Sequence, residues 1–457
     1  MAQEPQKSVI EGPTVAHLGV GAFHRAHQAW YTHRAAAAAA AAAGESWGIA
    51  AFTGRSVAQA QLLRTRRGHY TLITRAAGGD AYEQIDSIRA VHDGADRSRW
   101  DAAIADPQTH IVTLTITEAG YCRDLHGRLD VKDGAVQADL NRVVRAQAKA
   151  LTTAPVRLAV GLAARRAAGD SPLTIISCDN LSRNGEVTRA VVMDAAAIID
   201  GSLPDWIDAH VAFLSSMVDR ITPRTTAEDI EELRQRTGIF DEGAVVTEPF
   251  SEWVIEDGFA GPRPAWEEAG ARLTTQLHPF EERKLRILNG AHSLLAYQGL
   301  LRGFADVATA FADPQLRDLV ENYWSVAADS CSLPSSEIER AIAATRERFA
   351  NARIRHQLAQ IAQDGALKLP QRIVPVLAHA VRSGMATDVT ASAIAAWVAY
   401  EGRGSADIEN LLLGVGDAHI SGREPATSRM LALIEQELRR LEGDPRANAH
   451  LTGAVRS

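Results

Sequence analysis

Apolar residues in the first half of the chain come in short runs, with helix-like stretches between them. The runs that predict β-strands are Thr14–Leu18, Trp47–Phe52, Tyr70–Thr74, Ile111–Ile116 and Leu173–Ser177. A helical stretch from about Phe23 to Ala43 follows the first run. This alternation is typical of βαβ units, whose strands form a largely parallel sheet. We therefore expect an α/β domain with a mostly parallel sheet in this part of the chain.

The pattern changes near Pro279. From there to the end, long helical stretches follow one another without a convincing strand pattern. We expect an α/β domain over residues 1–278 and an all-helical domain over residues 279–457. No Gly/Ser-rich or Pro-rich linker separates the two parts. We therefore expect them to pack closely and to share a cleft.

Composition and charge narrow the class of protein. The 457 residues are 46% hydrophobic and 23% charged, which is ordinary for a globular protein and excludes a disordered chain. The formal net charge is -8, and no dense run of Lys and Arg provides an electrostatic footprint for nucleic acid or an anionic membrane. No charge-free apolar run is long enough to span a bilayer. A small-molecule partner is the expectation that remains.

The cysteines and the first residues bear on location. Cys122, Cys178 and Cys331 lie far apart and form neither a disulfide framework nor a CxxC metal site. The segment before Pro13 lacks the pattern of a secretory signal. We expect a cytoplasmic protein, as a monomer or a small homo-oligomer.

A glycine-containing segment follows the first predicted strand and opens a helix. It runs Gly19, Val20, Gly21, Ala22, Phe23, His24. In this context backbone N–H groups at the start of the helix can hold a dinucleotide pyrophosphate. His24 replaces the third glycine of the usual fingerprint, so we expect the helix to stand further from the sheet. A tight turn that needs the positive φ of glycine is an equally good interpretation of this segment alone.

The end of the second predicted strand leaves the choice of dinucleotide open. The acidic residue that would bind a ribose hydroxyl is absent after Phe52, and Arg55 could accept a 2′-phosphate instead. NAD and NADP both remain candidates. His24, His27 and His33 have no carboxylate or thiolate placed with them as a third metal ligand, so we interpret them as packing or hydrogen-bonding residues.

Polar segments follow two further strands. They are residues 117–121 (TEAGY) and residues 178–180 (CDN). Ligands bind open α/β sheets outside the carboxyl ends of the strands, where residues 19–21 also belong. Asp179 and Asn180 could instead cap the next helix. The coincidence of three such segments on one edge favours a binding site.

The most informative segment extends from Pro279 to His292. In α-helical geometry Lys284, Asn289 and His292 fall within an arc of about 140°, and apolar residues cover most of the remaining circumference. We expect this helix to be buried, so its polar side chains need hydrogen-bond partners or a role in binding or catalysis. Burial can lower the pKa of a lysine toward neutrality, which suits a proton acceptor. The alternative is a lysine that reaches the surface beside an ordinary core histidine.

Taken together, these residues resemble the polyol-specific long-chain dehydrogenases, the mannitol dehydrogenase family. The likeness covers nearly the whole chain. It rests on residues 19–28 (GVGAFHRAHQ), 115–121 (TITEAGY), 177–180 (SCDN) with 184–185 (NG), 217–223 (MVDRITP), 248–250 (EPF) with Trp253, and 284–292 (KLRILNGAH). The resemblance implies a metal-independent NAD(P) dehydrogenase with a Rossmann-type N-terminal domain, a helical C-terminal domain and an active site between them.

The resemblance also implies roles for individual residues. Lys284 would be the general base that takes the hydroxyl proton, and Asn180 and Asn289 would form an oxyanion pocket around the reacting oxygen. His292 would bind a neighbouring substrate hydroxyl, and Glu281 would help to pass the proton to water. This division of labour agrees with what oxidation of a secondary alcohol needs, namely a base within reach and donors around the developing alkoxide.

Cofactor and substrate contacts follow in the same way. Asp219 resembles the residue of this family that lies by the nicotinamide end of the site, and Lys368 is similar to a basic substrate-binding position. The other residues expected to bind the cofactor are Gly19, Val20, Gly21, Ala22, Phe23, Arg55 and Glu118. No zinc ligand set stands in for the lysine.

The expected function is NAD(P)-dependent interconversion of a sugar alcohol and its ketose, with D-mannitol and D-fructose as the first pair. D-arabinitol 4-dehydrogenase and fructuronate or tagaturonate reductase are alternatives within the family. A substrate carboxylate would call for a dedicated basic partner, and the sequence indicates no decisive one. A catalytically inactive dinucleotide-binding regulator is the alternative from another class.

Overall fold

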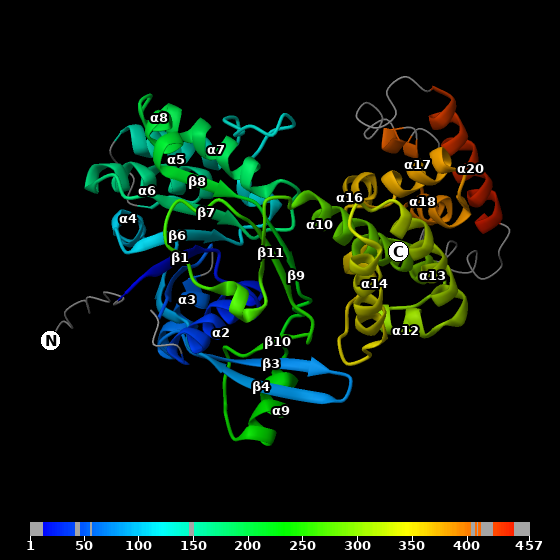
Figure 1. Cartoon of the computed structure of the whole chain (residues 1–457), viewed down its shortest axis with the longest axis horizontal. Helices are drawn as coiled ribbons and strands as arrows, with labels where there is room; N and C mark the ends of the chain where they lie inside the picture. The colour runs from blue at the N-terminus through cyan, green and yellow to red at the C-terminus, as the bar shows by residue number, and fades with distance from the viewer. Residues whose placement is uncertain are drawn as a thin grey trace. The chain divides into compact units, whose positions relative to one another are not determined.

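The computed structural model describes residues 12–41, 46–54, 57–145, 150–403, 407–408, 410–412 and 424–442. The chain divides into two compact units, Met1–Leu277 and His278–Ser457. Strands and helices alternate in the first unit, and the described residues of the second form helices and no strand (Figure 1). The predicted fold class, an α/β domain with a mostly parallel sheet followed by a helical domain, is confirmed.

A six-stranded parallel sheet forms the centre of the first unit. Its order is β5 (Ile88–His92), β2 (Gly48–Phe52), β1 (Thr14–Leu18), β6 (Thr109–Leu114), β7 (Leu173–Ser177) and β8 (Val211–Leu214). The predicted strands at 14–18 and 173–177 match β1 and β7 at both ends, and those at 47–52 and 111–116 match β2 and β6 within two residues. Every residue of β1, β2 and β7 is buried, which explains why these strands are almost continuously apolar.

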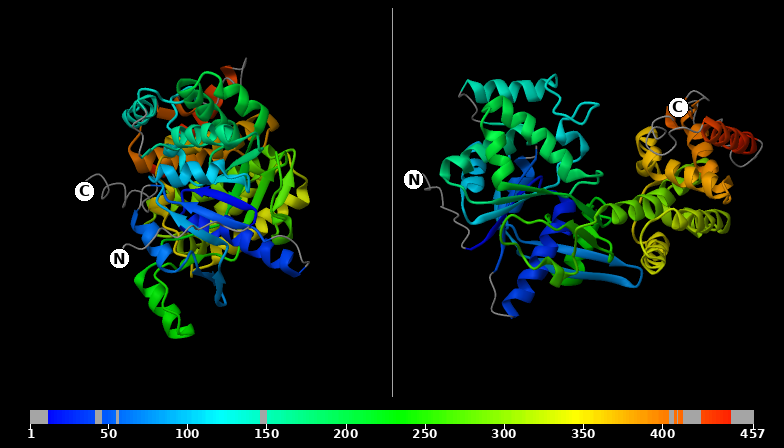
Figure 2. Two further views of the ribbon diagram at one scale, coloured as in Figure 1. Left: turned by 90° about the vertical axis from the view of Figure 1, so that its left-hand side faces the viewer. Right: turned by 45° about the horizontal axis from the view of Figure 1, so that its top comes forward.

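Helices cover both faces of this sheet (Figure 1, Figure 2). One face packs against α4 (Arg97–Ala105), α5 (Gly134–Val144), α6 (Ala154–Ala168) and α7 (Asn184–Ile199), and the other against α2 (Gln28–Ala41) and α3 (Val57–Thr65). Successive side chains of β1 point to opposite faces of the sheet. Ala16 and Leu18 therefore pack in the core on one face, and Val15 packs in the core on the other. The helix α8 (Leu203–His210) precedes β8.

The predicted strand at 70–74 exists, but it lies outside the main sheet. It is β3 (Tyr70–Ala76), which pairs antiparallel with β4 (Gly79–Ile85) and parallel with β10 (Val245–Thr247). The reason is the tight connection between β3 and β4, which makes a hairpin where the main sheet would need a crossover. A third small sheet contains β12 (Arg272–Thr274), β11 (Glu252–Glu256) and β9 (Ser216–Asp219).

The single helix predicted from Phe23 to Ala43 is two helices in the structure. The first is α1 (Ala22–Ala26), and α2 follows it after a break at His27, whose φ is -122° and ψ is -90°. The His27 ring hydrogen-bonds to the Glu252 carbonyl oxygen at 3.0 Å and lies against Phe23 and Trp253. These contacts come from distant parts of the chain, so the local sequence pattern did not indicate the break.

The second unit is built around one buried helix. Its elements are α10 (His278–Arg283), η3 (Lys284–Asn289), α11 (Gly290–Leu301), α12 (Val307–Ala312), α13 (Pro314–Asp329), α14 (Ser335–Ala350), α15 (Leu358–Ile361), α16 (Gly365–Arg372), α17 (Val374–Ser383), α18 (Asp388–Glu401) and α20 (Glu424–Glu442). All residues of α11 from Gly290 to Gly299 are buried. Within the described part of the chain, no helix is both long enough and apolar enough to cross a membrane.

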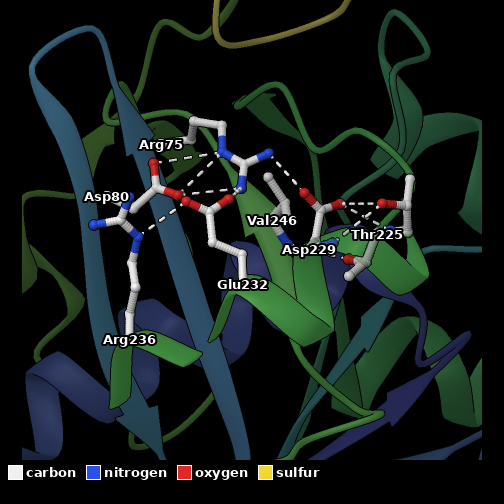
Figure 3. Close-up of polar contacts among 8 residues, drawn as sticks. Arg75, Asp80, Thr225, Asp229, Glu232, Arg236 and Val246 are labelled. Carbon is white, nitrogen blue, oxygen red and sulfur yellow. Dashed lines mark hydrogen bonds and ion pairs between the residues drawn. The ribbon is translucent and has the colours of Figure 1, made fainter. Parts of the chain in front are cut away.

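An ion-pair network joins α9 (Ala227–Thr237) to the β3–β4 hairpin (Figure 3). The Arg75 guanidinium lies 2.7 Å from Asp229, 3.1 Å from Asp80 and 3.7 Å from Glu232. Asp229 also completes a capping box with Thr226 at the start of α9. The Asp80 side chain is only 2% exposed, so the Arg75 cation compensates a largely desolvated carboxylate.

We expect Arg75→Ala to lower the free energy of unfolding by about 2 kcal/mol, because it leaves the Asp80 and Asp229 carboxylates without their cation. Urea denaturation followed by circular dichroism measures this change. Arg234→Ala is the matched control, since the Arg234–Glu231 pair lies on the exposed face of the same helix, and its midpoint should stay close to that of the parent protein. Equal effects of the two substitutions would contradict a stabilising network.

Candidate functional site

Three polar segments lie at the carboxyl edge of the parallel sheet. Residues 19–21, 115–121 and 178–180 follow β1, β6 and β7, and these strands are neighbours in the order β1-β6-β7. The register places Leu18 beside Leu114, and Leu114 beside Ser177, so the strands end almost in line. Ligands of open α/β sheets bind at this edge.

The turn after β1 requires glycine at its first position. Gly19 has a φ of +107°, and a Cβ there would lie 2.1 Å from the Thr115 carbonyl oxygen. The N–H groups of Gly19 and Val20 both donate to the Phe52 carbonyl oxygen, at 2.9 and 3.0 Å. The next N–H groups along the chain are those of Gly21 and of the first residues of α1. They have no partner within the helix, so they are the donors that this turn can offer to a ligand.

Two stacked histidine rings, His17 of β1 and His24 of α1, lie next to this turn. His17 and His24 are fully buried, with ring centroids 3.4 Å apart and an interplanar angle of 12°. The Thr115 hydroxyl donates to the Gly19 carbonyl oxygen and so accepts from His17 Nε2, which leaves Nδ1 to accept from Thr113. Burial lowers the pKa of His17 to about 3 and that of His24 well below its usual value. Both rings are therefore neutral packing elements.

The remaining histidines of this region also have structural contacts. His33 lies 2.8 Å from Asp86, and His27 bonds to the Glu252 backbone as described above. Among the described residues, no group of three or more His, Cys, Asp or Glu side chains could hold a metal ion. Arg55, the predicted 2′-phosphate contact, lies outside the described residues.

The turn after β6 has an unusual backbone. Thr117 has a φ of +63° and a ψ of +163°, a region that a β-branched residue rarely occupies. Glu118 begins the short helix η1 (Glu118–Tyr121), and its side chain is exposed at this edge. Strain of this kind persists only where surrounding contacts hold it, and it is concentrated at functional sites.

The segment after β7 does not cap the following helix. The residue that precedes α7 is Arg183, and the Asp179 side chain bonds elsewhere, to backbone N–H groups of the β6 turn. Asn184 instead fixes the segment, because its amide donates to the carbonyl oxygens of Asp179 and Ser216 and accepts from the Ser216 N–H. Asn180 is left with its side chain exposed at the sheet edge. The capping interpretation is therefore wrong.

Asp219 is the last residue of β9 and is buried. It pairs with Glu252 of β11 in the third sheet. Nearby in the chain, Ser215 bonds to Gly185 at the start of α7 and to Glu256, and Ser216 bonds to Asn184. The third sheet was absent from the sequence prediction, so the structure supplies the element that carries this residue.

The segment with Lys284, Asn289 and His292 contains a π-helical turn, which the sequence did not predict. Residues 284–289 form η3 between α10 and α11, and the Gly290 N–H bonds to the Leu285 carbonyl oxygen, five residues back. An α-helix would separate Lys284 and Asn289 by about 140° around the axis, whereas i→i+5 bonding brings residues five apart toward one face. The assumed α-helical arc is therefore wrong, and the structure brings these two residues closer.

Aromatic donors from α13 stabilise this turn. Tyr323 donates to the Arg286 carbonyl oxygen at 2.8 Å, and the Trp324 indole donates to the Ile287 carbonyl oxygen at 3.0 Å. Gly290 leaves room for the phenol, since a Cβ there would lie 1.9 Å from the Tyr323 oxygen. π turns inside α-helices occur frequently at functional sites.

Two buried polar atoms near this turn have no hydrogen-bond partner among the described residues. They are Asn289 Nδ2 and His292 Nε2, on side chains of residues that are 8% and 5% exposed. Burial lowers the pKa of His292 well below its usual value, and the neighbouring groups His356, Arg348, Arg372 and Lys284 lower it further. A neutral imidazole and an amide that are left unsatisfied in one helix indicate a place for ligand oxygens.

Lys284 and Glu281 lie on the first turns of the same helix. Glu281 is buried, but Lys284 is only partly buried, in contrast to the buried lysine expected from the sequence. The reason is that the helix becomes fully covered only from Ile287 onward, and residues 284–286 are all partly exposed.

Lys368, the predicted substrate contact, lies in α16. Its Nζ donates to the carbonyl oxygen of Gln363, just before the start of that helix, at 2.6 Å.

The structure adds neighbours of His292 that the sequence did not reveal. Phe349 stacks on its ring at 4.6 Å, and the His356 ring lies edge-on at 4.9 Å. Both come from segments far along the chain, and neither lies in a recognisable motif. Only the tertiary fold of the second unit brings them together.

Comparison with known proteins assigns both units. The family model for the mannitol dehydrogenase Rossmann domain matches residues 13–268, and that for the mannitol dehydrogenase C-terminal domain matches residues 276–419. D-arabinitol 4-dehydrogenase of Ralstonia nicotianae is 40% identical, over 85% of this chain and 83% of that protein. D-mannonate oxidoreductase of Escherichia coli is 37% identical, over 84% of this chain and 79% of that protein.

A solved structure is also similar over nearly the whole length. It is the ternary complex of Pseudomonas fluorescens mannitol 2-dehydrogenase with NAD and D-mannitol. The TM-score is 0.79 at 32% sequence identity, and the match covers 98% of this chain and 95% of that one.

We expect Gly19→Ala to lower the free energy of unfolding by about 3 kcal/mol, because it combines a disfavoured positive φ with a Cβ against the Thr115 carbonyl. Gly21→Ala is the control, since Gly21 has an extended φ of -137° and its nearest neighbour would lie 3.6 Å from a Cβ. Thermal unfolding of the two variants measures the difference. A Gly19→Ala variant as stable as Gly21→Ala would contradict the geometry described for this turn.

Proposed function

This chain belongs to the mannitol dehydrogenase family, and we propose that it is an NAD(P)-dependent oxidoreductase that interconverts a secondary alcohol of a polyol and the corresponding ketone. D-Mannitol and D-fructose are the first expected pair, and D-arabinitol is the next polyol to consider. The relatives named above act on polyols or sugar acids according to their names, and the similar solved structure binds NAD and D-mannitol.

The observation that carries this proposal is that two buried polar atoms of one helix, Asn289 Nδ2 and His292 Nε2, lack a hydrogen-bond partner among the described residues. Asn289 Nδ2 can donate to a reacting oxygen, and His292 Nε2 can bond to a neighbouring hydroxyl. Leaving both buried without a partner costs free energy, and a polyhydroxylated ligand would recover it. Lys284 is brought toward the face of Asn289 by the π turn, which suits a base that acts on the same hydroxyl.

The glycine turn of the first unit fits a dinucleotide. A Cβ at Gly19 would clash with the Thr115 carbonyl oxygen, so the turn needs glycine there, and the N–H groups of Gly21, Ala22 and Phe23 begin a helix. Glu118 and Asp219 are proposed to contact the cofactor as well, together with Gly19, Val20 and Arg55. Bound NAD would supply the hydride acceptor. NAD is the first choice because of the similar structure, and NADP stays open because no acidic residue follows Phe52.

In this proposal the protein's own residues handle the proton. The Lys284 amine takes the proton from the substrate hydroxyl, and the amides of Asn180 and Asn289 donate to the oxygen as it becomes negative. Glu281 lies one turn before Lys284 on the same helix and is proposed to pass the proton to water. Lys368 is proposed to contact the substrate, although its amine also holds a backbone carbonyl.

A sugar acid is the second candidate substrate. The positive charges of Arg348 and Arg372 reach His292, as their effect on its pKa indicates, and a substrate carboxylate would be attracted to them. The sequence alone showed no decisive basic partner, and the fold supplies these two from α14 and α16. The relative named D-mannonate oxidoreductase agrees with this candidate.

One assay distinguishes these substrates. Purified protein is incubated with mannitol, arabitol, sorbitol or mannonate and either NAD or NADP, and with fructose or fructuronate and the reduced cofactors, while nicotinamide absorbance is followed. Turnover of a polyol supports the first proposal, and turnover of only the acids supports the second. A shift of the melting temperature by NAD without turnover of any of these compounds would favour an inactive dinucleotide-binding protein.

We expect Lys284→Ala to reduce kcat for alcohol oxidation about 1000-fold, because it removes the general base. The affinity for NAD, measured by tryptophan fluorescence, should be unchanged. Lys132→Ala, at an exposed site of the first unit, is the control and should keep full activity. Near-parental turnover in Lys284→Ala would contradict the assigned role.

We expect His292→Gln to raise KM for the substrate about tenfold, because one hydrogen bond to a hydroxyl is weakened. Burial lowers the pKa of His292 well below its usual value, so the ring is uncharged throughout the neutral pH range. The pH profile of kcat/KM should therefore have the same shape in both proteins over that range. Loss of a limb near neutral pH in His292→Gln would contradict a neutral histidine.

A further inference from the structure

The Asp179 carboxylate bridges two strand ends at the carboxyl edge of the sheet. It accepts from the N–H of Ile116 at 3.0 Å and from the N–H of Thr117 at 2.8 Å, both in the turn after β6. It also accepts from the Tyr121 hydroxyl at 2.7 Å, at the end of η1. Asp179 itself follows β7 and is buried. One side chain thus connects both segments.

The segment that it holds does not have a relaxed backbone. Thr117 lies at positive φ, and Gly120 packs so closely that a Cβ would lie 2.9 Å from Ile116 Cβ. Because the Thr117 conformation costs free energy, it needs an outside contact to persist, and the Asp179 bond to its N–H is such a contact. The direction in which Glu118 leaves the sheet follows from this backbone.

The same residue also sets the start of the Asn180 segment. The Asp179 carbonyl oxygen accepts from the Asn184 amide, which in turn bonds to both backbone groups of Ser216. The side chain and the main chain of Asp179 are therefore both fixed, and Asn180 is the next residue. Through these hydrogen bonds Asp179 connects the end of β6, the end of β7 and the start of β9.

We propose that Asp179 is a positioning residue, whose ionised carboxylate holds the Thr117–Glu118 turn and Asn180 in one fixed arrangement for cofactor binding and for turnover. This inference rests on the proposed function. It extends that function by giving a role to a residue that is not among the proposed substrate and cofactor contacts. Three donors point at the carboxylate, so the ionised form satisfies them all, and a protonated carboxyl would bring a competing donor.

The first test replaces Asp179 with Asn. Asparagine keeps the shape of the side chain, but its NH₂ group cannot accept from a backbone N–H, so one of the two hydrogen bonds to the turn after β6 is lost. We expect kcat to fall about 100-fold through misplacement of the site residues and Kd for NAD to rise about tenfold. The Kd is measured by tryptophan fluorescence on the complete chain, which gives a readout that does not depend on turnover.

Asp241→Asn is the matched control for a loss of stability. Asp241 is a fully buried carboxylate that also accepts from two backbone N–H groups, those of Thr71 at 2.6 Å and Gly243 at 2.8 Å. Its partners lie beside the small β10-β3-β4 sheet instead of at the carboxyl edge of the parallel sheet. Asp241→Asn should lower the melting temperature and leave kcat and Kd for NAD unchanged.

The second test uses the pH profile, which a purely structural role would not move. Burial raises the pKa of Asp179, the nearby Glu118 charge raises it further, and the bond from Tyr121 lowers it. Cys178 also adjoins it, but burial raises the pKa of that thiol, so it stays protonated and neutral. Since the fixed arrangement requires the ionised carboxylate, Tyr121→Phe should raise this pKa, and the Kd for NAD should begin to rise at a higher pH on acidification than in the parent protein.

The outcomes separate this inference from the proposed function. If Asp179→Asn and Asp241→Asn lose kcat and NAD affinity equally, or if Asp179→Asn keeps both near parental values, the positioning role is wrong. An unchanged pH dependence of the Kd for NAD in Tyr121→Phe would also overturn it. If the parent protein binds NAD but oxidises no polyol or sugar acid, the proposed function fails, and the NAD affinities of the two variants still decide the role of Asp179.

Discussion

The parallel pairing of β1, β6 and β7 is the constraint on which the rest of the first unit depends. Their register ends the three strands together, so every segment that leaves them starts from the same edge. The glycine turn, the strained Thr117 turn and the Asn180 segment are then close enough to share hydrogen bonds. Thr115 supports Gly19, and Asp179 supports Thr117, so neighbouring strand ends hold one another in place.

Buried polar groups are treated differently around Asp179 and around Asn289. At the sheet edge, Asp179 and Asn184 have several partners each, so this part of the site is assembled before any ligand arrives. In the second unit, Asn289 and His292 each keep a buried atom without a partner among the described residues. A satisfied network gives fixed geometry, whereas an unsatisfied pair gives affinity for the group that completes it. The proposed chemistry needs both.

The sequence predicted those features that depend on local pattern. The buried strands β1 and β7 are continuous apolar runs, and the site segments follow them at once, so both were found. The sheet that contains β3, the break at His27 and the π turn at Lys284 were missed, because contacts from distant residues such as Glu252 and Tyr323 determine them. The role of Asp179 was open for the same reason, since its partners lie on another strand.

The π turn has a consequence for anyone who wishes to transplant this set of side chains. A designed scaffold with an ideal α-helix would carry the same lysine, asparagine and histidine at the same spacing and still aim them in different directions. One extra residue in the turn rotates everything beyond it by about 100° relative to regular geometry. A faithful graft would have to include the glycine and the phenol that accommodate the bulge, Gly290 and Tyr323.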